Sequence, residues 1–137
     1  MDKKIFGLIL GIAAVLVVAT AAMGTITAAN FVDVEICNET FHIPSEFKEV
    51  NRTNGTNETN VLFEKDINTS IVIGVVPDQN LTDQNLTQSL TDGYVNKTIS
   101  GVNGVYNDKL HDFSYIKDGK LITISAPDEK IIEEILK

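Results

Sequence analysis

Residues 70–76 read Ser-Ile-Val-Ile-Gly-Val-Val, and this short stretch decides the fold class that we expect. Successive side chains of an extended chain point to opposite faces, so the apolar residues of this stretch lie on both faces. A strand with two apolar faces belongs in the middle of a sheet that is covered on both sides. We therefore expect residues 70–76 to form a central strand, with helices packed on the sheet.

Further strand candidates lie on both sides of this stretch, at residues 31–36, 41–43, 47–50, 61–65, 97–106, 112–117 and 120–126. The segment Asp66 to Thr69 predicts a hairpin turn, and Asp118-Gly119 predicts a tight turn between two strands. Glycines within residues 97–106 predict a single strand that is bulged or bent. Residues 51–60 contain no apolar side chain, so they predict a loop at the tip of a hairpin.

Two stretches have the periodicity of a helix. In residues 81–94, Leu86, Leu90 and Tyr94 lie four positions apart on one stripe. Residues 128–137 place four apolar side chains on one face, and Ser125 supplies a start that resembles a capping box. The sequence thus predicts an α+β fold. Its antiparallel sheet has about six or seven strands in a ββββαββα-like order with hairpins, is packed by two helices and follows an N-terminal hydrophobic helix.

The N-terminus has the pattern of an export segment. Lys3 and Lys4 precede residues 5–29, which carry no charge and end in small residues. This pattern is typical of a cleaved secretory signal, and the uncharged run is also long enough to remain as a membrane anchor. Residues 1–29 are therefore a signal peptide or an uncleaved anchor, and residues 30–137 are a single extracytoplasmic domain. We expect the protein to be secreted, or held in the cell membrane through residues 5–29 with its C-terminal domain outside.

Eight Asn-x-Ser/Thr triplets follow the leader, and each is a candidate for N-glycosylation. Three of them recur every three residues within the predicted loop at 51–60. Such a triplet becomes a glycan site only outside the cytoplasm, where chain and transferase meet. The leader and the triplets therefore predict an exported glycoprotein. The candidate asparagines are Asn38, Asn51, Asn54, Asn57, Asn68, Asn80, Asn85 and Asn96.

Charge and cysteine content restrict the partners and the covalent chemistry. The net charge is −8, which argues against nucleic acid as a partner because nucleic acid rewards basic clusters. Cys37 is the only cysteine, so no internal disulfide forms. In an exported protein, a lone cysteine indicates a buried thiol, an intermolecular disulfide or an anaerobic setting.

No catalytic, cofactor-binding or metal-binding residue is predicted. Metal ligands would come from Cys37, His42, His111 and Asp112, whose spacing lacks the close pairs of a zinc site. Hydrolase chemistry would use Ser114 with His111 and Asp112, but no nucleophile elbow surrounds Ser114. Adjacent residues of a strand face apart, so these three side chains are not expected to converge as a triad. Calcium ligands would come from Asp78, Asp83 and Asp92, which are too widely spaced for a calcium loop. Glu133 and Glu134 are expected on the solvent face of the last helix.

The stretch Phe41-His42-Ile43-Pro44-Ser45-Glu46-Phe47 resembles the opening of small exported domains of the PsbP/Mog1/DcrB-like families, in which a strand enters a proline turn. Residues 101–104, 113–115 and 131–135 are similar to short secreted proteins of unknown function from methanogenic archaea. The resemblance implies an antiparallel sheet with helices on its faces and a role as an accessory subunit. It transfers no functional residue, because these families share no catalytic motif that matches this chain.

The function expected from the sequence is that of an exported, N-glycosylated cell-surface or secreted domain with a non-enzymatic binding or structural role. One alternative is an accessory subunit of an envelope or membrane complex, with an envelope protein as its partner. The other alternative is an enzyme whose site has no recognisable motif. Co-purification separates the first two, and a pocket lined by converging acids or histidines would favour the third.

Overall fold

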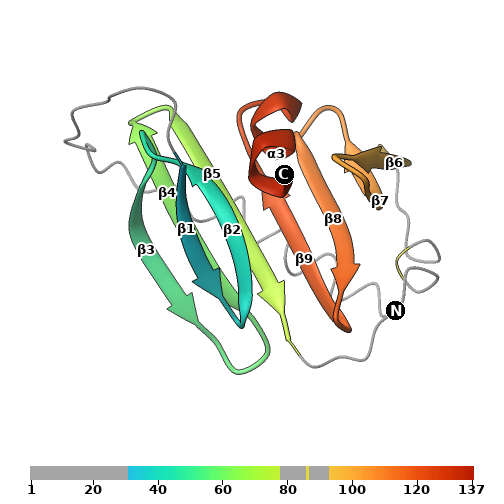
Figure 1. Cartoon of the computed structure of the whole chain (residues 1–137), viewed down its shortest axis with the longest axis horizontal. Coiled ribbons are helices and arrows are strands. Elements are labelled where there is room, and N and C mark those ends of the chain that lie inside the picture. The colour runs from blue at the N-terminus through green and yellow to red at the C-terminus, as the bar shows by residue number, and fades with distance from the viewer. Residues whose placement is uncertain (1–30, 78–85, 87–92) are drawn as a thin grey trace.

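The structure is a computed structural model that describes residues 31–77, Leu86 and residues 93–137. The described residues form nine antiparallel strands and one C-terminal helix (Figure 1). The elements are β1 (Phe31–Ile36), β2 (Glu39–Pro44), β3 (Lys48–Asn54), β4 (Thr59–Asp66), β5 (Thr69–Val76), β6 (Tyr94–Ile99), β7 (Val102–Asn107), β8 (Asp112–Lys117), β9 (Lys120–Ser125) and α3 (Glu129–Leu136).

Seven of these strands form one antiparallel sheet in the order β3-β4-β5-β9-β8-β7-β6, and β1 and β2 form a separate two-stranded sheet. Strand β5 pairs with β4 on one side and with β9 on the other. Every residue of β5 from Ile71 to Val76 is buried. The predicted central position of residues 70–76 is therefore confirmed, as is the hairpin turn between β4 and β5.

Three hairpins turn through pairs of residues with positive φ. The pairs are Cys37-Asn38, Ser100-Gly101 and Asp118-Gly119. Two such residues in succession form a turn whose twist matches that of the flanking strands. The prediction at Asp118-Gly119 is confirmed. The prediction of one bent strand over residues 97–106 is wrong, because Gly101 adopts a φ of +80° and reverses the chain between β6 and β7.

The predicted loop at residues 51–60 is shorter than expected. Strand β3 continues to Asn54, and β4 begins at Thr59. The two strands pair from Lys48↔Glu64 to Asn54↔Thr59, with an irregularity between Glu49 and Asn51. The sequence did not indicate this pairing. An edge strand forms backbone hydrogen bonds with one neighbour only and needs few apolar side chains.

One face of the seven-stranded sheet is covered by the β1–β2 hairpin and by α3 (Figure 1). The hairpin contributes Ile36, Phe41 and Ile43 to the core, and α3 contributes Ile132 and Ile135. The sheet residues in the same core are Val61, Phe63, Ile71, Ile73, Val75, Ile99, Tyr106, Phe113, Tyr115, Ile122 and Ile124.

Residues that alternate with this core on the second face are also buried. Leu62, Val72 and Leu121 are among them. The polar Ser114 and Thr123 lie opposite each other there, and their hydroxyl oxygens are 2.8 Å apart in a hydrogen bond. Burial on both faces agrees with the two apolar faces that the β5 sequence predicts.

The predicted α+β class, with two helices packed on the sheet, is wrong: the structure is mostly β and has nine strands in two sheets. Helix α3 is the single helix whose extent the described residues define. The other predicted helix, residues 81–94, lies mostly outside them, and Tyr94 begins β6. The short β1–β2 hairpin covers the sheet where the prediction expected a helix. Its alternating apolar side chains form one face that packs against the sheet.

The predicted C-terminal helix is confirmed, although its cap differs. Asp128 is the N-cap, and its carboxylate accepts a hydrogen bond from the backbone N–H of Ile131 at 3.0 Å. Ser125 instead ends β9. The predicted leader at residues 1–29 lies outside the described residues. Among those that are described, no helix has the length and apolar character needed to cross a bilayer.

Candidate functional site

The candidate glycosylation asparagines lie in turns and on outer strands. Asn38 is in the β1–β2 turn, Asn57 in the β3–β4 turn and Asn68 in the β4–β5 turn. Asn51 and Asn54 lie on β3, and Asn96 lies on β6. Asn51 is half-buried and the other five are exposed. Asn80 and Asn85 fall outside the described residues.

Asn60 provides an internal comparison for these sites. It continues the three-residue spacing of Asn51, Asn54 and Asn57, but Leu62 stands where a glycan site needs Ser or Thr. The Asn60 residue is 2% exposed on β4, whereas Asn54 and Asn57 are exposed. In this repeat, the asparagine that lacks the hydroxyl residue is also the one that the fold buries.

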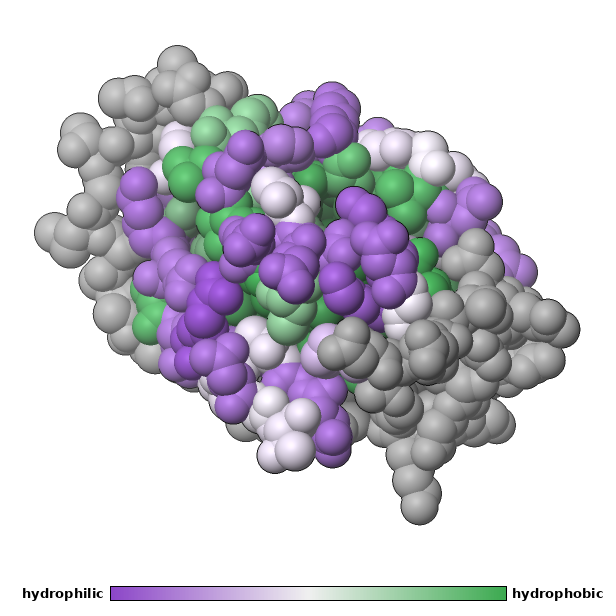
Figure 2. All heavy atoms as spheres, turned by 60° about the horizontal axis from the view of Figure 1, so that its bottom comes forward, coloured by the Kyte–Doolittle hydropathy of each residue, from purple (hydrophilic) through white to green (hydrophobic). Residues whose placement is uncertain are grey.

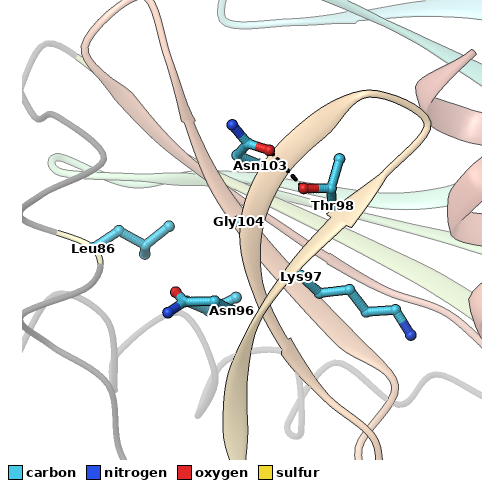
Figure 3. Close-up of a pocket in the computed structure, with 7 residues that line it drawn as sticks. Leu86, Asn96, Lys97, Thr98, Asn103 and Gly104 are labelled. Atoms are coloured by element: carbon cyan, nitrogen blue, oxygen red, sulfur yellow. Dashed lines mark hydrogen bonds between the residues drawn. The ribbon is translucent and has the colours of Figure 1, made fainter.

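Around Asn96, the surface has a hollow of about 360 Å³. It is bordered by Leu86, Asn96, Asn103 and Val105, among others. Figure 3 shows the Asn96 side chain pointing to the side on which Leu86 lies, whereas Lys97 points the opposite way. The Thr98 hydroxyl, which completes the Asn96 triplet, donates a hydrogen bond to Asn103 Oδ1 at 2.6 Å.

The residues weighed as metal ligands or catalysts do not converge. Cys37 is in the β1–β2 turn and is half-buried, whereas a buried thiol was one of the predicted states. His42 lies on β2, where its Nδ1 is 2.5 Å from Asp33 Oδ1 on β1. His111 precedes β8 with a φ of 56°. Within the described part of the chain, no three His, Cys, Asp or Glu side chains form a group able to hold a metal.

Asp112 and Ser114 lie on the second face of β8, and both side chains are engaged. The buried Tyr94 hydroxyl donates to Asp112 Oδ2 at 3.2 Å, and the Ser114 hydroxyl is bonded to Thr123. Burial raises the pKa of Asp112, with hydrogen bonds from Ser125 and Tyr94 opposing that shift. The same burial, together with the neighbouring Asp112 charge, raises the pKa of Tyr94. This buried pair holds β6 against β8 across β7, which is a structural task.

The structure describes the two glutamates of the last helix but not the three aspartates that were weighed as calcium ligands. Glu133 is exposed on α3 as expected, and Glu134 is half-buried with its carboxylate 3.6 Å from Lys137 Nζ. Asp78, Asp83 and Asp92, the weighed calcium ligands, lie outside the described residues.

A buried carboxylate that the sequence did not indicate lies at the start of β2. The Glu39 side chain is 4% exposed, and its Oε2 accepts a hydrogen bond from Lys120 Nζ at 2.9 Å. Lys120 also donates to the backbone oxygen of Cys37 at 2.9 Å, and Lys117 Nζ is 3.3 Å from Glu39 Oε1. Burial alone raises the pKa of Glu39, but the hydrogen bonds, led by that from Lys120, outweigh it and hold this pKa below its usual value. The partners are about eighty residues apart in sequence, so no local pattern reveals them.

A groove of about 430 Å³ runs between β2, the β8 end and the last turn of α3. The partly exposed apolar residues of its wall are Val102, Ile116 and Leu136, and its polar rim includes Lys117 and Lys137. Each of the two ammonium groups already lies near a carboxylate of the protein, Lys117 near Glu39 and Lys137 near Glu134. Figure 2 shows that hydrophilic side chains predominate on the displayed surface and that apolar ones emerge in separate areas between them.

Comparison with protein-family models, with curated proteins and with solved structures finds no significant match to this chain. The resemblance to PsbP/Mog1/DcrB-like domains therefore stays a prediction.

Proposed function

We propose that this chain is an exported β-rich domain that carries N-linked glycans and has a non-enzymatic binding or structural role at the cell surface. The observation that supports the proposal most directly is the contrast within one polar repeat. Asn54 and Asn57 stand in complete triplets and are exposed, whereas Asn60 stands in an incomplete triplet and is buried.

The wider distribution of asparagines supports the same proposal. Of the described asparagines in complete triplets, five are exposed and Asn51 is half-buried. Of the described asparagines outside such triplets, Asn60 and Asn107 are buried and Asn103 is exposed. A glycan is a bulky, solvated group that needs an exposed attachment atom, so the complete triplets occupy the positions that suit it.

Export is the second part of the proposal, and residues 1–29 are the proposed export segment. Their basic start and uncharged run are the features that direct a chain into a membrane. Cleavage gives a secreted domain, and retention gives a domain anchored through residues 5–29.

The test is the intact mass of the protein purified from its native membrane and medium. We expect masses that exceed the polypeptide mass by whole glycan units, with or without loss of residues 1–29. Peptide mapping provides the matched control, because Asn57 should carry a glycan in part of the molecules whereas Asn60 should carry none. Recovery of the unprocessed and unmodified chain from the cytosol would overturn the proposal.

A stable envelope protein that co-purifies would favour the accessory-subunit role over a structural coat. The groove beside α3 offers such a partner an apolar wall and the two lysines, Lys117 and Lys137. A monomer that purifies alone, with its glycans, would favour the structural role.

A further inference from the structure

The seven-stranded sheet has two outer strands, β3 and β6, at the ends of its strand order. Each pairs with one neighbour within the described residues, β3 with β4 and β6 with β7. The outward side of such a strand presents backbone N–H and C=O groups that another strand can use. Proteins block this kind of pairing with charges, bulges or covering groups.

The two edges differ in their protection. Strand β3 has a register irregularity between Glu49 and Asn51, and it carries Lys48, Glu49 and Arg52. Strand β6 pairs with β7 without a register shift over its whole length and carries one charged residue, Lys97. Its Val95 is 58% exposed, so β6 presents an apolar side chain beside a regular backbone edge.

The complete glycosylation triplets on the strands of this sheet have a matching distribution. Among its described strands, asparagines of such triplets occur on β3 (Asn51 and Asn54) and on β6 (Asn96). The asparagines on the described inner strands β4 and β7 are Asn60, Asn103 and Asn107, and none of them belongs to a complete triplet. Both outer strands therefore carry a candidate attachment site near their middle.

We propose that glycans on Asn51 and Asn96 prevent the sheet from extending by edge pairing with a second copy of this chain. The inference rests on the proposed glycosylation and gives the glycans a specific role, which is to prevent self-association through the sheet edges. An added strand would lie about 4.8 Å from the edge, with its side chains directly opposite those of β3 or β6. A sugar ring on the asparagine amide occupies the space that the opposite side chain would need, so the glycosylated edge excludes the partner strand.

The experiment compares two double variants of the full chain in a host that glycosylates it. Asn51→Gln with Asn96→Gln removes one triplet from each outer strand and retains the amide groups. Thr40→Ala with Ser70→Ala is the matched control, because it removes the triplets of the turn asparagines Asn38 and Asn68. Mass spectrometry establishes that each double variant has lost glycan from its two altered triplets, and sedimentation over a hundredfold concentration range measures self-association.

The edge variant should form dimers and larger species at concentrations at least tenfold lower than the control, which should behave like the parent. Asn96→Gln alone should have a larger effect than Asn51→Gln alone, because β6 lacks the bulge and charges of β3. Adding Val95→Lys to the edge variant should restore the monomer, since a charge on the edge replaces the missing glycan. Such a rescue distinguishes edge pairing from a general loss of solubility.

Equal monomer content in the edge and control variants, with glycan loss verified, would overturn this inference and leave the proposed glycosylation intact. Absence of glycan from every triplet of the parent protein would overturn the proposed function and this inference together.

Discussion

At the scale of single residues, the polar repeat at residues 51–60 shows how position in the sheet decides whether an asparagine is exposed or buried. Asn57 and Asn60 are three positions apart and chemically identical, but Asn60 pairs with Thr53 on β3 and Gly74 on β5 inside the sheet. Among the described residues, the buried Oδ1 atom of Asn60 accepts no hydrogen bond, so this amide is held inside the sheet with its acceptor unsatisfied.

Glu39 is the residue whose environment gives the clearest dependence on pH. Lys120→Met removes its main hydrogen-bond donor and leaves a buried carboxylate, so the free energy of unfolding at pH 7 should fall by about 2–3 kcal/mol. Lys117→Met is the control, because Lys117 is 57% exposed and should contribute less than about 1 kcal/mol. Urea titration of the parent and both variants measures the difference.

The sign of the pH effect follows from the lowered pKa of Glu39. A carboxyl whose folded pKa lies below its unfolded value of 4.5 stabilises the fold above that pH, and this contribution disappears as the pH falls through the folded pKa. The difference between the parent and Lys120→Met should therefore shrink as the pH falls, because the carboxyl of the variant, which has lost its main donor, takes up a proton at a higher pH than that of the parent. A difference that stays constant from pH 7 to pH 3 would show that Lys120 acts through packing alone.

At the scale of elements, Gly101 and Gly104 have different reasons for being glycine. A Cβ on Gly104 would lie 2.3 Å from the backbone oxygen of Ser114 and 2.8 Å from Phe113 Cζ, whereas one on Gly101 meets no atom within 4 Å. Gly104→Ala should therefore lower the free energy of unfolding by about 2–3 kcal/mol through overpacking. Gly101→Ala should lower it by about 1 kcal/mol, because alanine must adopt a positive φ in the turn.

Thermal unfolding of both variants measures these changes. A larger loss in Gly101→Ala than in Gly104→Ala would contradict the close approach of β7 and β8.

The same elements show what the sequence can predict. The apolar run of β5 and the Asp118-Gly119 turn carry strong local signals, and both predictions are confirmed. The β6–β7 hairpin was missed because Ser100-Gly101 is a weaker turn signal than Asp-Gly, and the flanking residues look like one strand. The polar residues of β3 gave no periodic signal, because an outer strand depends on backbone pairing more than on burial.

The candidate glycosylation sites could be named from the sequence because a triplet is local. Their distribution over the outer strands could not, since strand order depends on pairings between distant segments. The Glu39–Lys120 contact was not predicted either, because these two residues are also distant in sequence.

At the scale of the whole molecule, the β1–β2 hairpin is the least obvious part of the fold. Among the described strands it pairs with none of the larger sheet. A two-stranded hairpin is marginally stable by itself, so its order must come from the contacts of Ile36, Phe41 and Ile43 with the core. Helix α3 packs beside β2 and buries Ile132 and Ile135 in the same core, so hairpin and helix act as one cover.

Phe41→Ala tests this arrangement, because Phe41 is 2% exposed and projects from the hairpin into the shared core. Truncation should lower the free energy of unfolding by about 3–5 kcal/mol. Hydrogen exchange should show amides of β1, β2 and α3 losing protection together, while β5 and β9 keep theirs until global unfolding. Val32→Ala, at the exposed start of β1, is the control and should change stability by less than about 0.5 kcal/mol. If α3 kept its full protection when the hairpin lost its own, the two elements would be independent supports of the sheet, and the cover would have to be described as two separate parts.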